Sequence, residues 1–371
     1  MALQSTTAKA AVLRNVGGPF NMEQITVAAP REDEVRVKIV GVGVCHTDMV
    51  VRDGFPMPLP VVLGHEGSGI VEAVGPDVKK VRVGDRVVLS FNSCGTCYSC
   101  KHEHPATCAQ FLAHNFAGVR LSDGSTPLSQ DGKMVHGVFF GQSSFATYAI
   151  AREINTVVVK ADDPLEILGP LGCGIQTGAG AAINSVNIRP GQSLAVFGGG
   201  AVGLSALLGA KAVDAGQVFV VEPNAQRRAL AIELGAAKAF DPKDGSDIAE
   251  AIKAASGGGV HHAIDTTGIP SVIGTAFNCV LPGGRLGLVG IPAPDTPIPV
   301  NLMDLLTKGV SLQPITEGDA DPQIFIPQML EYHRKGKFPF DKLITKFSFD
   351  QINEAMHASE TGAAIKPVLV I

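Results

Sequence analysis

Several features that would point to a secreted, membrane or nucleic-acid-binding protein are missing from this sequence. The first ten residues lack the apolar core of a signal peptide. The longest apolar run, residues 194–213, is interrupted by glycines and by Lys211, so we expect no membrane-spanning segment. A net charge of −5 and a pI near 6.1 do not provide the basic excess that nucleic-acid binding requires. We therefore expect a cytoplasmic protein with neither a membrane nor a nucleic-acid partner.

The sequence also lacks the even cysteine count of a disulfide framework. It has seven cysteines, and four of them, Cys94, Cys97, Cys100 and Cys108, lie within fifteen residues. Without a secretory signal this pattern favours metal binding over disulfides, and four clustered thiolates suit a closed, structural zinc site. An iron–sulfur cluster is the alternative, but its ferredoxin signature has a three-residue last gap followed by proline. Here the last gap is seven residues and Ala109 follows, so we predict a structural zinc.

A chain of 371 residues exceeds what one hydrophobic core supports, so we expect two domains. Over residues 8–88, short β-branched runs such as 35–40, 69–74 and 85–89 alternate with glycine, proline and aspartate. This period-two pattern predicts a compact, barrel-like β unit. Residues 111–141 have the glycine and serine content of one long connection, a length typical of a functional or disordered loop.

From about Gly174 the pattern changes to alternating strands and helices, which predicts a doubly wound parallel sheet. A strand at 193–197 is followed by Gly198-Gly199-Gly200-Ala201-Val202-Gly203, which opens a helix. A second strand, 218–221, ends in Glu222. A glycine motif in this context is the dinucleotide-binding fingerprint.

Each residue of the fingerprint has a physical role. Gly198 permits the tight turn, Gly200 lets the pyrophosphate approach the backbone, and Gly203 allows close helix–strand packing. Glu222 would accept hydrogen bonds from the ribose hydroxyls and repel a 2′-phosphate, which predicts NAD rather than NADP. Arg227 is placed to contact the ribose or a phosphate, although a solvated helical arginine is the alternative.

The pattern continues to the end of the chain. We predict a helix from Asn224 to Gly235, strands at 262–265 and 285–289 with a helix between them, a helix around 349–358 and a strand at 366–371.

A second metal site is predicted from residues 41–75. Cys45 and His65 lie at the expected ends of strands, and Cys173, far along the chain, is flanked by glycines. Thiolate and imidazole are ligands that zinc prefers, and a catalytic zinc takes three protein ligands and leaves one position open. Asp48 and Glu66 would then orient the ligands and tune the metal. A buried apolar cysteine and a hydrogen-bonded core histidine are the alternatives.

Together these residues resemble the zinc-dependent medium-chain alcohol dehydrogenases, and the similarity covers essentially the whole chain. Gly64-His65-Glu66-x-x-Gly69-x₅-Gly75 matches the zinc signature of that family. Within the family the chain is most similar to bacterial geraniol and benzyl (aryl) alcohol dehydrogenases, on segments 43–48, 141–145, 168–178 and 336–341.

The resemblance implies a GroES-like β-barrel catalytic domain, residues 1–174 and 313–371, and a Rossmann NAD-binding domain, residues 175–312. It implies that Cys45, His65 and Cys173 bind a catalytic zinc, so that each subunit holds NAD and two Zn²⁺. It also implies a homo-oligomer, either a dimer or a tetramer.

The implied activity is the reversible, NAD-dependent oxidation of primary allylic or benzylic alcohols, such as geraniol, perillyl alcohol and benzyl alcohol, to aldehydes. Thr47 would relay the proton of the alcohol toward solvent. Many family members end this relay at a histidine where this chain has Val50, so His46 becomes the nearest substitute base or a pyrophosphate contact. Lys366 matches a basic position near the pyrophosphate, with a solvated lysine as the alternative.

Other activities on the same scaffold stay open. The rivals are S-hydroxymethylglutathione dehydrogenase and short aliphatic alcohol dehydrogenase. Quinone and enoyl reductases and non-enzymatic relatives lack the zinc ligands, whereas this chain has all seven candidates. Phenylalanines close in sequence to the zinc-bearing segments would suit a flat, apolar, unsaturated substrate; they are Phe91, Phe139, Phe140 and Phe145.

Overall fold

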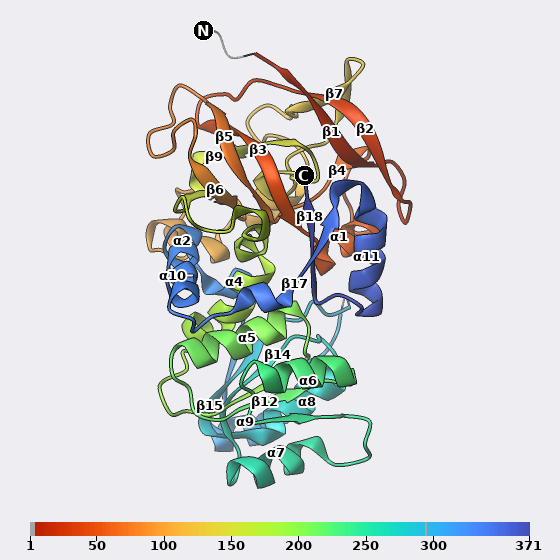
Figure 1. Cartoon of the computed structure of the whole chain (residues 1–371). Coiled ribbons are helices and arrows are strands. Elements are labelled where there is room, and N and C mark those ends of the chain that lie inside the picture. The colour runs from red at the N-terminus through yellow and green to blue at the C-terminus, as the bar shows by residue number, and fades with distance from the viewer. Residues whose placement is uncertain (1–3, 294) are drawn as a thin grey trace. The chain divides into compact units, whose positions relative to one another are not determined.

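The structure is a computed structural model that describes residues 4–293 and 295–371, and the chain divides into two compact units (Figure 1). The first unit contains the residues up to Cys173 together with Asp321–Pro327 and Leu343–Ile371. The second unit contains Gly174–Ala320 and Gln328–Lys342.

The first unit is built on two sheets. The smaller has the strand order β4-β1-β2-β7-β8, with bounds β1 (Thr6–Leu13), β2 (Phe20–Val27), β4 (Val61–Val62), β7 (Leu128–Gln130) and β8 (Lys133–Val135). The larger has the order β10-β6-β5-β3-β18-β17, with β9 also paired to β3. Its bounds are β3 (Glu34–Gly43), β5 (Gly67–Val74), β6 (Arg86–Leu89), β9 (Tyr148–Arg152), β10 (Thr156–Val158), β17 (Ile344–Ser348) and β18 (Lys366–Val370). The predicted strands at 35–40, 69–74 and 85–89 fall within or overlap β3, β5 and β6.

The C-terminal strand β18 lies beside β3, with Val368 opposite Gly43 in an antiparallel register (Figure 1). This pairing brings the last residues of the chain next to the segment that carries Cys45. Cys45 itself follows β3 and precedes helix α1 (His46–Arg52). Residues in loops that leave a rigid sheet are well placed to form a site.

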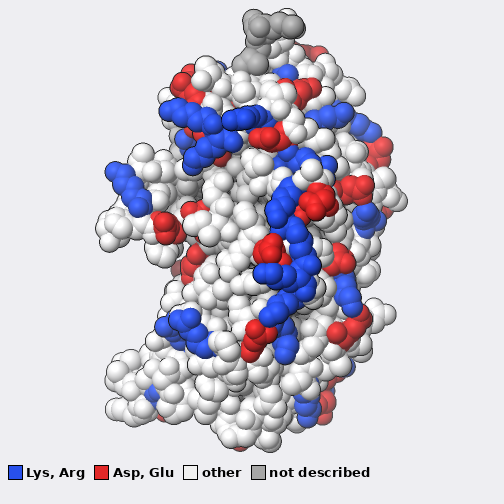
Figure 2. Space-filling model, turned by 60° about the vertical axis from the view of Figure 1, so that its left-hand side comes forward, with Lys and Arg blue, Asp and Glu red and all other residues white. Residues whose placement is uncertain are grey.

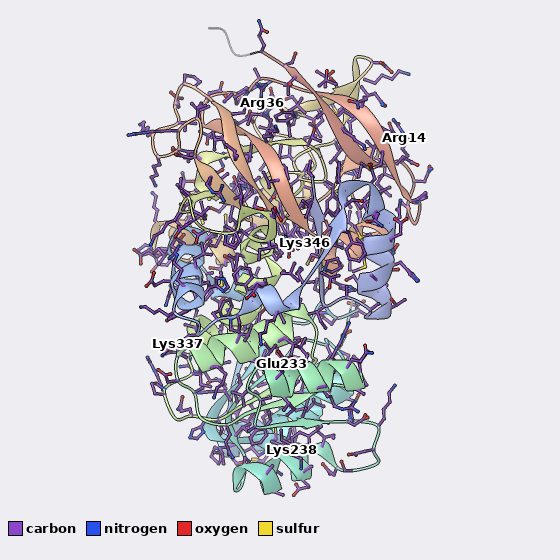
Figure 3. All side chains as sticks on the ribbon, viewed as in Figure 1. Arg14, Arg36, Glu233, Lys238, Lys337 and Lys346 are labelled. Atoms are coloured by element: carbon purple, nitrogen blue, oxygen red, sulfur yellow. The ribbon has the colours of Figure 1, made fainter. Side chains whose placement is uncertain are left out.

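Each sheet has an ion pair between neighbouring segments, and Figure 3 labels the arginine of each, Arg14 and Arg36. Arg14 lies 2.6 Å from the carboxylate of Glu23 near the β1–β2 pair. Arg36 on β3 lies 2.7 Å from Glu72 on β5. Because at least one partner of each pair is solvent-exposed, such pairs contribute little to stability, and the buried apolar side chains between the strands supply most of it.

The expectation of one irregular connection over residues 111–141 is wrong. The segment contains helix α3 (Phe111–Phe116), the hairpin β7–β8 and a 3₁₀ turn at Phe139–Gly141. The hairpin closes at Asp131-Gly132, both with positive φ, as a tight two-residue turn requires. The elements are too short to produce a recognisable hydrophobic period, which is why the sequence pattern does not reveal them.

The second unit has a six-stranded, fully parallel sheet of order β13-β12-β11-β14-β15-β16. The bounds are β11 (Leu194–Phe197), β12 (Val218–Val221), β13 (Lys238–Phe240), β14 (Val260–Asp265), β15 (Val280–Leu288) and β16 (Ser311–Pro314). This order is that of the dinucleotide-binding doubly wound fold, with a crossover point next to the first strand. The predicted parallel sheet is therefore confirmed.

Helices cover both faces of this sheet (Figure 1). They are α4 (Gly174–Gly180), α5 (Ala201–Ala212), α6 (Ala225–Glu233), α7 (Ile248–Ser256), α8 (Pro270–Cys279) and α9 (Leu302–Lys308). The predicted helix after Asn224 is α6, and the Asn224 side chain accepts hydrogen bonds from the backbone N–H groups of Gln226 and Arg227 as its N-cap. It stops before Gly235, which has a φ of 103°.

Two further helices come from the end of the chain, α10 (Pro322–Arg334) and α11 (Ile352–Thr361). The predicted helix at 349–358 begins as a 3₁₀ turn and continues as α11. Within residues 4–293 and 295–371, no helix has the length and apolar character needed to cross a bilayer.

Candidate functional site

His65 lies in the loop between β4 and β5 and is held by Asp48 from helix α1. The Asp48 carboxylate is 3.0 Å from His65 Nδ1 and also accepts hydrogen bonds from the backbone N–H groups of Gly64 and Cys45. Asp48 and His65 have no solvent exposure. An Nδ1–H donated to Asp48 leaves Nε2 as the ring's free lone pair, and this atom has no hydrogen-bond partner among the described residues.

The free nitrogen belongs to a cluster of four potential metal ligands. Atoms of Cys45, His65, Glu66 and Cys173 all lie within 4.8 Å of one another. A hydrogen bond from the Cys173 thiol lowers the pKa of Cys45 well below its usual value, despite burial, and the nearby Lys366 cation acts in the same direction. Two thiol groups and one oriented imidazole are the donor set that a catalytic zinc takes, so these residues fit that ion.

The Glu66 carboxylate in this cluster is fully buried and paired. Lys366 Nζ lies 2.8 and 2.9 Å from its two oxygens and also donates to the carbonyl of Val44, at 3.1 Å. Burial raises the pKa of Glu66, and the lysine cation opposes that shift. Lys366 is 2% exposed, so the alternative of a solvated lysine is wrong.

The residues expected to move the proton lie at the start of α1. Thr47 is half-buried, and its hydroxyl oxygen is 3.9 Å from Cys45 Sγ. His46, the neighbouring residue, is exposed. The helix therefore places a hydroxyl beside the cluster and an imidazole in solvent, with the half-buried, non-titrating Val50 one turn further along.

Aromatic rings pack around His65. The ring of Phe140 stacks on the imidazole at a centroid distance of 4.5 Å, and the edge-on ring of Phe139 is at 5.2 Å. The ring of Phe116 contacts the rings of Phe139 and Phe140. Phe55, which is 40% exposed, contacts Phe116 at a centroid distance of 5.0 Å. The rings therefore form a continuous apolar series from the imidazole to the surface.

Two of the rings in this series, Phe55 and Phe116, are not found by sequence reasoning, because neither belongs to a recognisable motif. The other predicted rings do not contact the His65 ring themselves; Phe91 joins the series through Phe111, which lies 6.2 Å from Phe140, and Phe145 packs against Gly64. Phe91 contacts Phe111 at 5.7 Å, and Phe145 contacts Phe20 at 5.8 Å.

The four remaining candidate ligands form a second cluster. Cys94, Cys97, Cys100 and Cys108 have their sulfur atoms within 4.8 Å of one another. The sulfur of Cys100 lies 3.8 Å from that of Cys94 and 3.5 Å from that of Cys97. These separations exceed the roughly 2.05 Å of a disulfide. A tetrahedral ion with metal–sulfur bonds of about 2.3 Å would give sulfur–sulfur edges of about 3.8 Å.

Backbone N–H groups point at these sulfurs. Thr96 and Cys97 donate to Cys94 Sγ at 3.4 and 3.2 Å, and Gln110 donates to Cys108 Sγ at 3.4 Å. Burial raises the pKa of Cys94, but these N–H donors outweigh it and lower the value to about 6. These donors therefore favour the thiolate of Cys94, the form that binds zinc, whereas burial raises the pKa of Cys100 to about 12 and also raises that of Cys108.

In the second unit, the glycine-rich turn joins β11 to α5. Gly198 has a φ of 100°, which a side chain would disfavour. A Cβ on Gly203 would lie 1.8 Å from the Gly198 carbonyl oxygen, so only glycine allows α5 to pack this closely. Glu222, at the end of β12, is 4% exposed and accepts hydrogen bonds from the N–H groups of Gly199 at 2.7 Å and Asn224 at 2.8 Å.

Arg227 lies across this turn from α6. A Cβ on Gly200 would meet only the Arg227 guanidinium, at 4.0 Å, so the space over Gly200 is otherwise open. Arg227 Nε is buried and has no hydrogen-bond partner among the described residues. An open turn at a helix N-terminus, with a cation beside it, suits a pyrophosphate.

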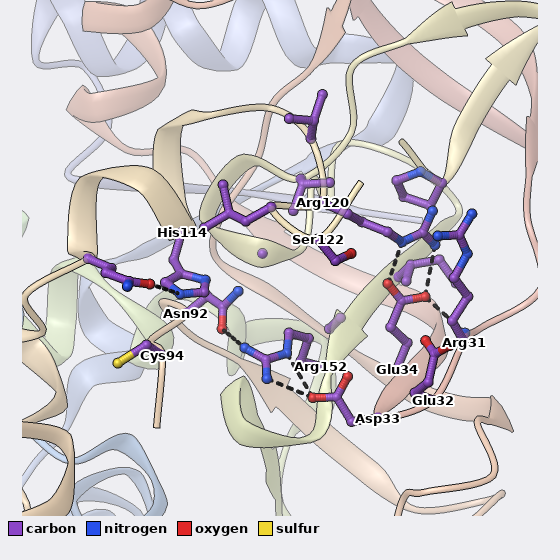
Figure 4. A pocket seen from close by; sticks show the side chains of 18 of the residues that line it. Arg31, Glu32, Asp33, Glu34, Asn92, Cys94, His114, Arg120, Ser122 and Arg152 are labelled. Atoms are coloured by element: carbon purple, nitrogen blue, oxygen red, sulfur yellow. Dashed lines mark hydrogen bonds and ion pairs between the residues drawn. The ribbon is translucent and has the colours of Figure 1, made fainter. Parts of the chain in front are cut away.

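A hollow of about 410 Å³ lies between the cysteine lobe, the segment from Cys94 to Cys108, and the start of β3 (Figure 4). Its charged walls are paired within the chain. Arg120 donates two hydrogen bonds to Glu34 at 2.6 and 2.8 Å, and Arg152 lies 2.8 Å from Asp33. Burial lowers the pKa of His114, so this wall favours the neutral imidazole. These two ion pairs neutralise the charges of the four residues that form them.

Comparison with known proteins agrees with this geometry. Residues 31–163 match the alcohol dehydrogenase GroES-like domain, and residues 201–332 match the zinc-binding dehydrogenase domain. The chain is 65% identical to a geraniol dehydrogenase of Castellaniella defragrans over 98% of both chains.

The chain is also similar to solved structures of alcohol dehydrogenases. A benzyl alcohol dehydrogenase from Acinetobacter calcoaceticus is 44% identical over 99% of both chains, with a TM-score of 0.95. An alcohol dehydrogenase zinc-binding domain protein from Burkholderia ambifaria is 47% identical over 99% of this chain and 100% of its own, with a TM-score of 0.97. These matches confirm the predicted resemblance and the GroES-like plus Rossmann fold class. The chain belongs to the zinc-type medium-chain alcohol dehydrogenases, a family of oxidoreductases.

Proposed function

We propose that this protein is an NAD-dependent zinc alcohol dehydrogenase that reversibly oxidises primary allylic or benzylic alcohols to aldehydes. The observation that carries the proposal is the buried cluster of Cys45, His65 and Cys173, with the imidazole oriented by Asp48 and flanked by aromatic rings. The names of two relatives, a geraniol dehydrogenase and a benzyl alcohol dehydrogenase, support the substrate class.

In this proposal Cys45, His65 and Cys173 hold the catalytic zinc, which when bound supplies a Lewis acid that lowers the pKa of the alcohol. Asp48 keeps His65 in the tautomer with Nε2 free. Lys366 balances the charge of Glu66 beside the two thiolates. Because both groups of this ion pair are buried, removal of either one would leave an uncompensated buried charge beside the proposed zinc ligands.

Thr47 takes the role of proton carrier, because its hydroxyl lies beside Cys45. From Thr47 the proton passes toward solvent, and His46, exposed on the same helix, is the candidate base at the outer end. Val50 takes no part, since its side chain holds no titrating group.

The Phe140 and Phe139 rings provide an apolar wall next to His65. A substrate with a double bond or an aromatic ring next to the carbinol carbon would pack its flat face against such rings. The same π system stabilises the positive charge that develops at that carbon when hydride leaves. A two-carbon alcohol fills little of this wall, and each missing buried CH₂ forfeits about 0.8 kcal/mol.

The second unit is proposed to bind NAD, which accepts the hydride. Gly198, Gly200 and Gly203 form the pyrophosphate turn, Arg227 contacts a phosphate or the ribose, and Glu222 contacts the adenosine ribose. We keep residues 1–174 and 313–371 as the proposed catalytic domain and 175–312 as the proposed NAD-binding domain. For Lys366, the pairing with Glu66 favours a role in the metal cluster over a direct pyrophosphate contact.

A homo-oligomer, either a dimer or a tetramer, is also proposed. Among the described residues β16 is the edge strand of its sheet, and the nearby helix α9 exposes large apolar side chains. Leu302, Met303 and Leu306 are each 65% or more exposed. An exposed apolar patch beside an unpaired strand edge is a typical protein–protein contact. Light scattering on the purified enzyme tests this, and a monomer at working concentration would contradict it.

Cytoplasmic localisation stays a prediction, as does the absence of a nucleic-acid partner. On the face that Figure 2 shows, most lysine and arginine side chains have aspartates or glutamates beside them. Such intermixed charge gives that face little of the uniform positive potential that nucleic-acid backbones require.

The proposal is tested by Cys173→Ser. We expect the variant to fold, to keep the zinc of the cysteine lobe and to lose alcohol oxidation, because two ligands do not hold a catalytic zinc tightly. Zinc analysis should give about two ions per wild-type subunit and about one in the variant. Iron in the purified protein, or full activity of Cys173→Ser, would contradict the assignment.

A further inference from the structure

The side chain of Gln142 uses all of its hydrogen-bonding capacity inside the first unit. It is 1% exposed, and its Nε2 donates to the carbonyl oxygens of His65 at 2.9 Å and Ser90 at 3.1 Å. Its Oε1 accepts from the backbone N–H of Gly67 at 3.0 Å and from the hydroxyl of Ser144 at 2.9 Å. The backbone partners fix the orientation of the amide, because carbonyls only accept and an N–H only donates.

These partners belong to the segments that carry the proposed catalytic ligands. His65 is itself a ligand, and Gly67 follows the buried Glu66. Ser90 extends the connection further, since its hydroxyl donates to the carbonyl of Gly172 at 2.6 Å. Gly172 immediately precedes Cys173. The amide of Gln142, through Ser90, therefore connects the backbone of His65 to the backbone beside Cys173, across more than one hundred residues of sequence.

The backbone on both sides of Gln142 adopts left-handed conformations. Phe140 has a φ of 50°, Gly141 of 63° and Ser143 of 51°. Left-handed backbone conformations are unfavourable for residues other than glycine, such as Phe140 and Ser143, and persist only where the surrounding structure holds them. A Cβ on Gly67 would lie 2.7 Å from Ser144 Cβ, so the two segments pack as closely as glycine allows.

We propose that Gln142 is a positioning residue for the zinc ligands Cys45, His65 and Cys173. Its amide fixes the backbone spacing between His65 and Cys173, so that their ligand atoms keep the separation that a zinc ion needs. The proposal rests on the proposed catalytic zinc site. It assigns a physical role to the Gly141-Gln142-Ser143-Ser144-Phe145 segment beyond its use as a family pattern.

The test compares the zinc-loaded full-length protein with Gln142→Leu, which keeps a similar volume and removes all four hydrogen bonds. Each protein is mixed with iodoacetamide and excess EDTA, and the alkylation rates of Cys45 and Cys97 are followed by peptide mass spectrometry. Coordination to zinc lowers the nucleophilicity of a thiolate, so its alkylation accelerates when the ion leaves. We expect Cys45 to be alkylated at least ~10-fold faster in Gln142→Leu, the scale for loss of a group that orients a metal ligand, with Cys97 unchanged.

Asn115→Leu is the matched control. Asn115 is also a fully buried amide, and its three hydrogen bonds to the backbone of Asn92 and Phe111 do not involve the segments that carry Cys45, His65 or Cys173. Its loss should leave the alkylation rate of Cys45 unchanged. If Asn115→Leu accelerates Cys45 as much as Gln142→Leu does, the effect is general loosening and the proposal is overturned.

If Gln142→Leu does not fold, Gln142→Glu replaces it in the alkylation experiment. It keeps the acceptors for Gly67 and Ser144 but removes the two N–H donors to His65 and Ser90. Faster alkylation of Cys45 in this variant supports the proposal, and a wild-type rate overturns it. Equal alkylation of Cys45 in zinc-loaded and zinc-free wild type would instead overturn the catalytic zinc site itself.

Discussion

The Glu222 carboxylate is expected to decide between NAD and NADP. It is 4% exposed at the end of β12, and it already accepts hydrogen bonds from the N–H groups of Gly199 and Asn224. A carboxylate has about four acceptor positions, so two remain for the ribose hydroxyls of NAD. The 2′-phosphate of NADP would replace a hydroxyl donor with a negative group facing this buried carboxylate.

The size of the preference follows from one charge-assisted hydrogen bond. Such a bond contributes about 1.5–3 kcal/mol, and each 1.4 kcal/mol corresponds to a factor of ten. We therefore expect the wild type to prefer NAD by roughly 10- to 150-fold in kcat/KM, before the repulsion of the phosphate is added. Glu222→Gln keeps the shape, but its one amide oxygen can accept from only one of the N–H groups of Gly199 and Asn224, whereas Glu222→Ser removes both bonds.

The assay is steady-state oxidation of one alcohol with each cofactor, for wild type, Glu222→Gln and Glu222→Ser. Both variants should narrow the preference, and Glu222→Ser should also lose thermal stability because two buried N–H groups lose their acceptor. Equal use of NADP by the wild type would refute the assignment of Glu222. An unchanged preference in both variants would show that another residue makes the choice.

Two further predictions concern stability. Cys97→Ser should lower the zinc content by about one ion per subunit and reduce the midpoint of thermal unfolding, because three thiolates do not close the tetrahedral site; an unchanged midpoint by calorimetry would contradict a structural role for the cysteine lobe. His262 on β14 is buried, and burial, with Arg285 and His261 nearby, lowers its pKa to about 4. The folded protein therefore resists protonation at a pH where the unfolded chain, with a pKa of about 6.5, accepts the proton. Above about pH 6.5 His262 therefore costs the folded protein no stability. The free energy of unfolding decreases as the pH falls toward 4, by about 2 kcal/mol at pH 5. His262→Gln should show a smaller loss of stability between pH 7 and 5 in denaturant titrations than the wild type, and identical losses would exclude His262 as the source.

The parts of the fold that could be predicted from the sequence are those whose determinants are adjacent in the chain. The glycine turn from Gly198 to Gly203 follows a strand and opens a helix within a few residues, so its pattern predicts its structure directly. The spacing of Cys94, Cys97 and Cys100 likewise predicts a cluster, because one short turn brings the three sulfurs together.

What could not be predicted depends on contacts between distant segments. The pairing of Lys366 with Glu66 joins residues 300 positions apart, and no periodicity relates them. The same is true of the bond between Gln142 and the carbonyl of His65, 77 positions apart. Such contacts are set by the sheet pairing of β18 with β3 and by the close packing of loops. Asp48 and Glu66 are predicted next to the zinc ligands because they lie close to them in the sequence, whereas the contacts of Lys366 and Gln142 appear only once the fold is known.

The substrate class is tested most directly by a steady-state panel with NAD. Geraniol, perillyl alcohol, benzyl alcohol, ethanol and S-hydroxymethylglutathione are compared in kcat/KM on the same zinc-loaded preparation. We predict that the three unsaturated alcohols exceed ethanol and the glutathione adduct by at least ~10-fold, because only they place a π system against the rings beside His65. A higher kcat/KM for ethanol or for the glutathione adduct would contradict the proposed substrate class, even if both zinc sites are present.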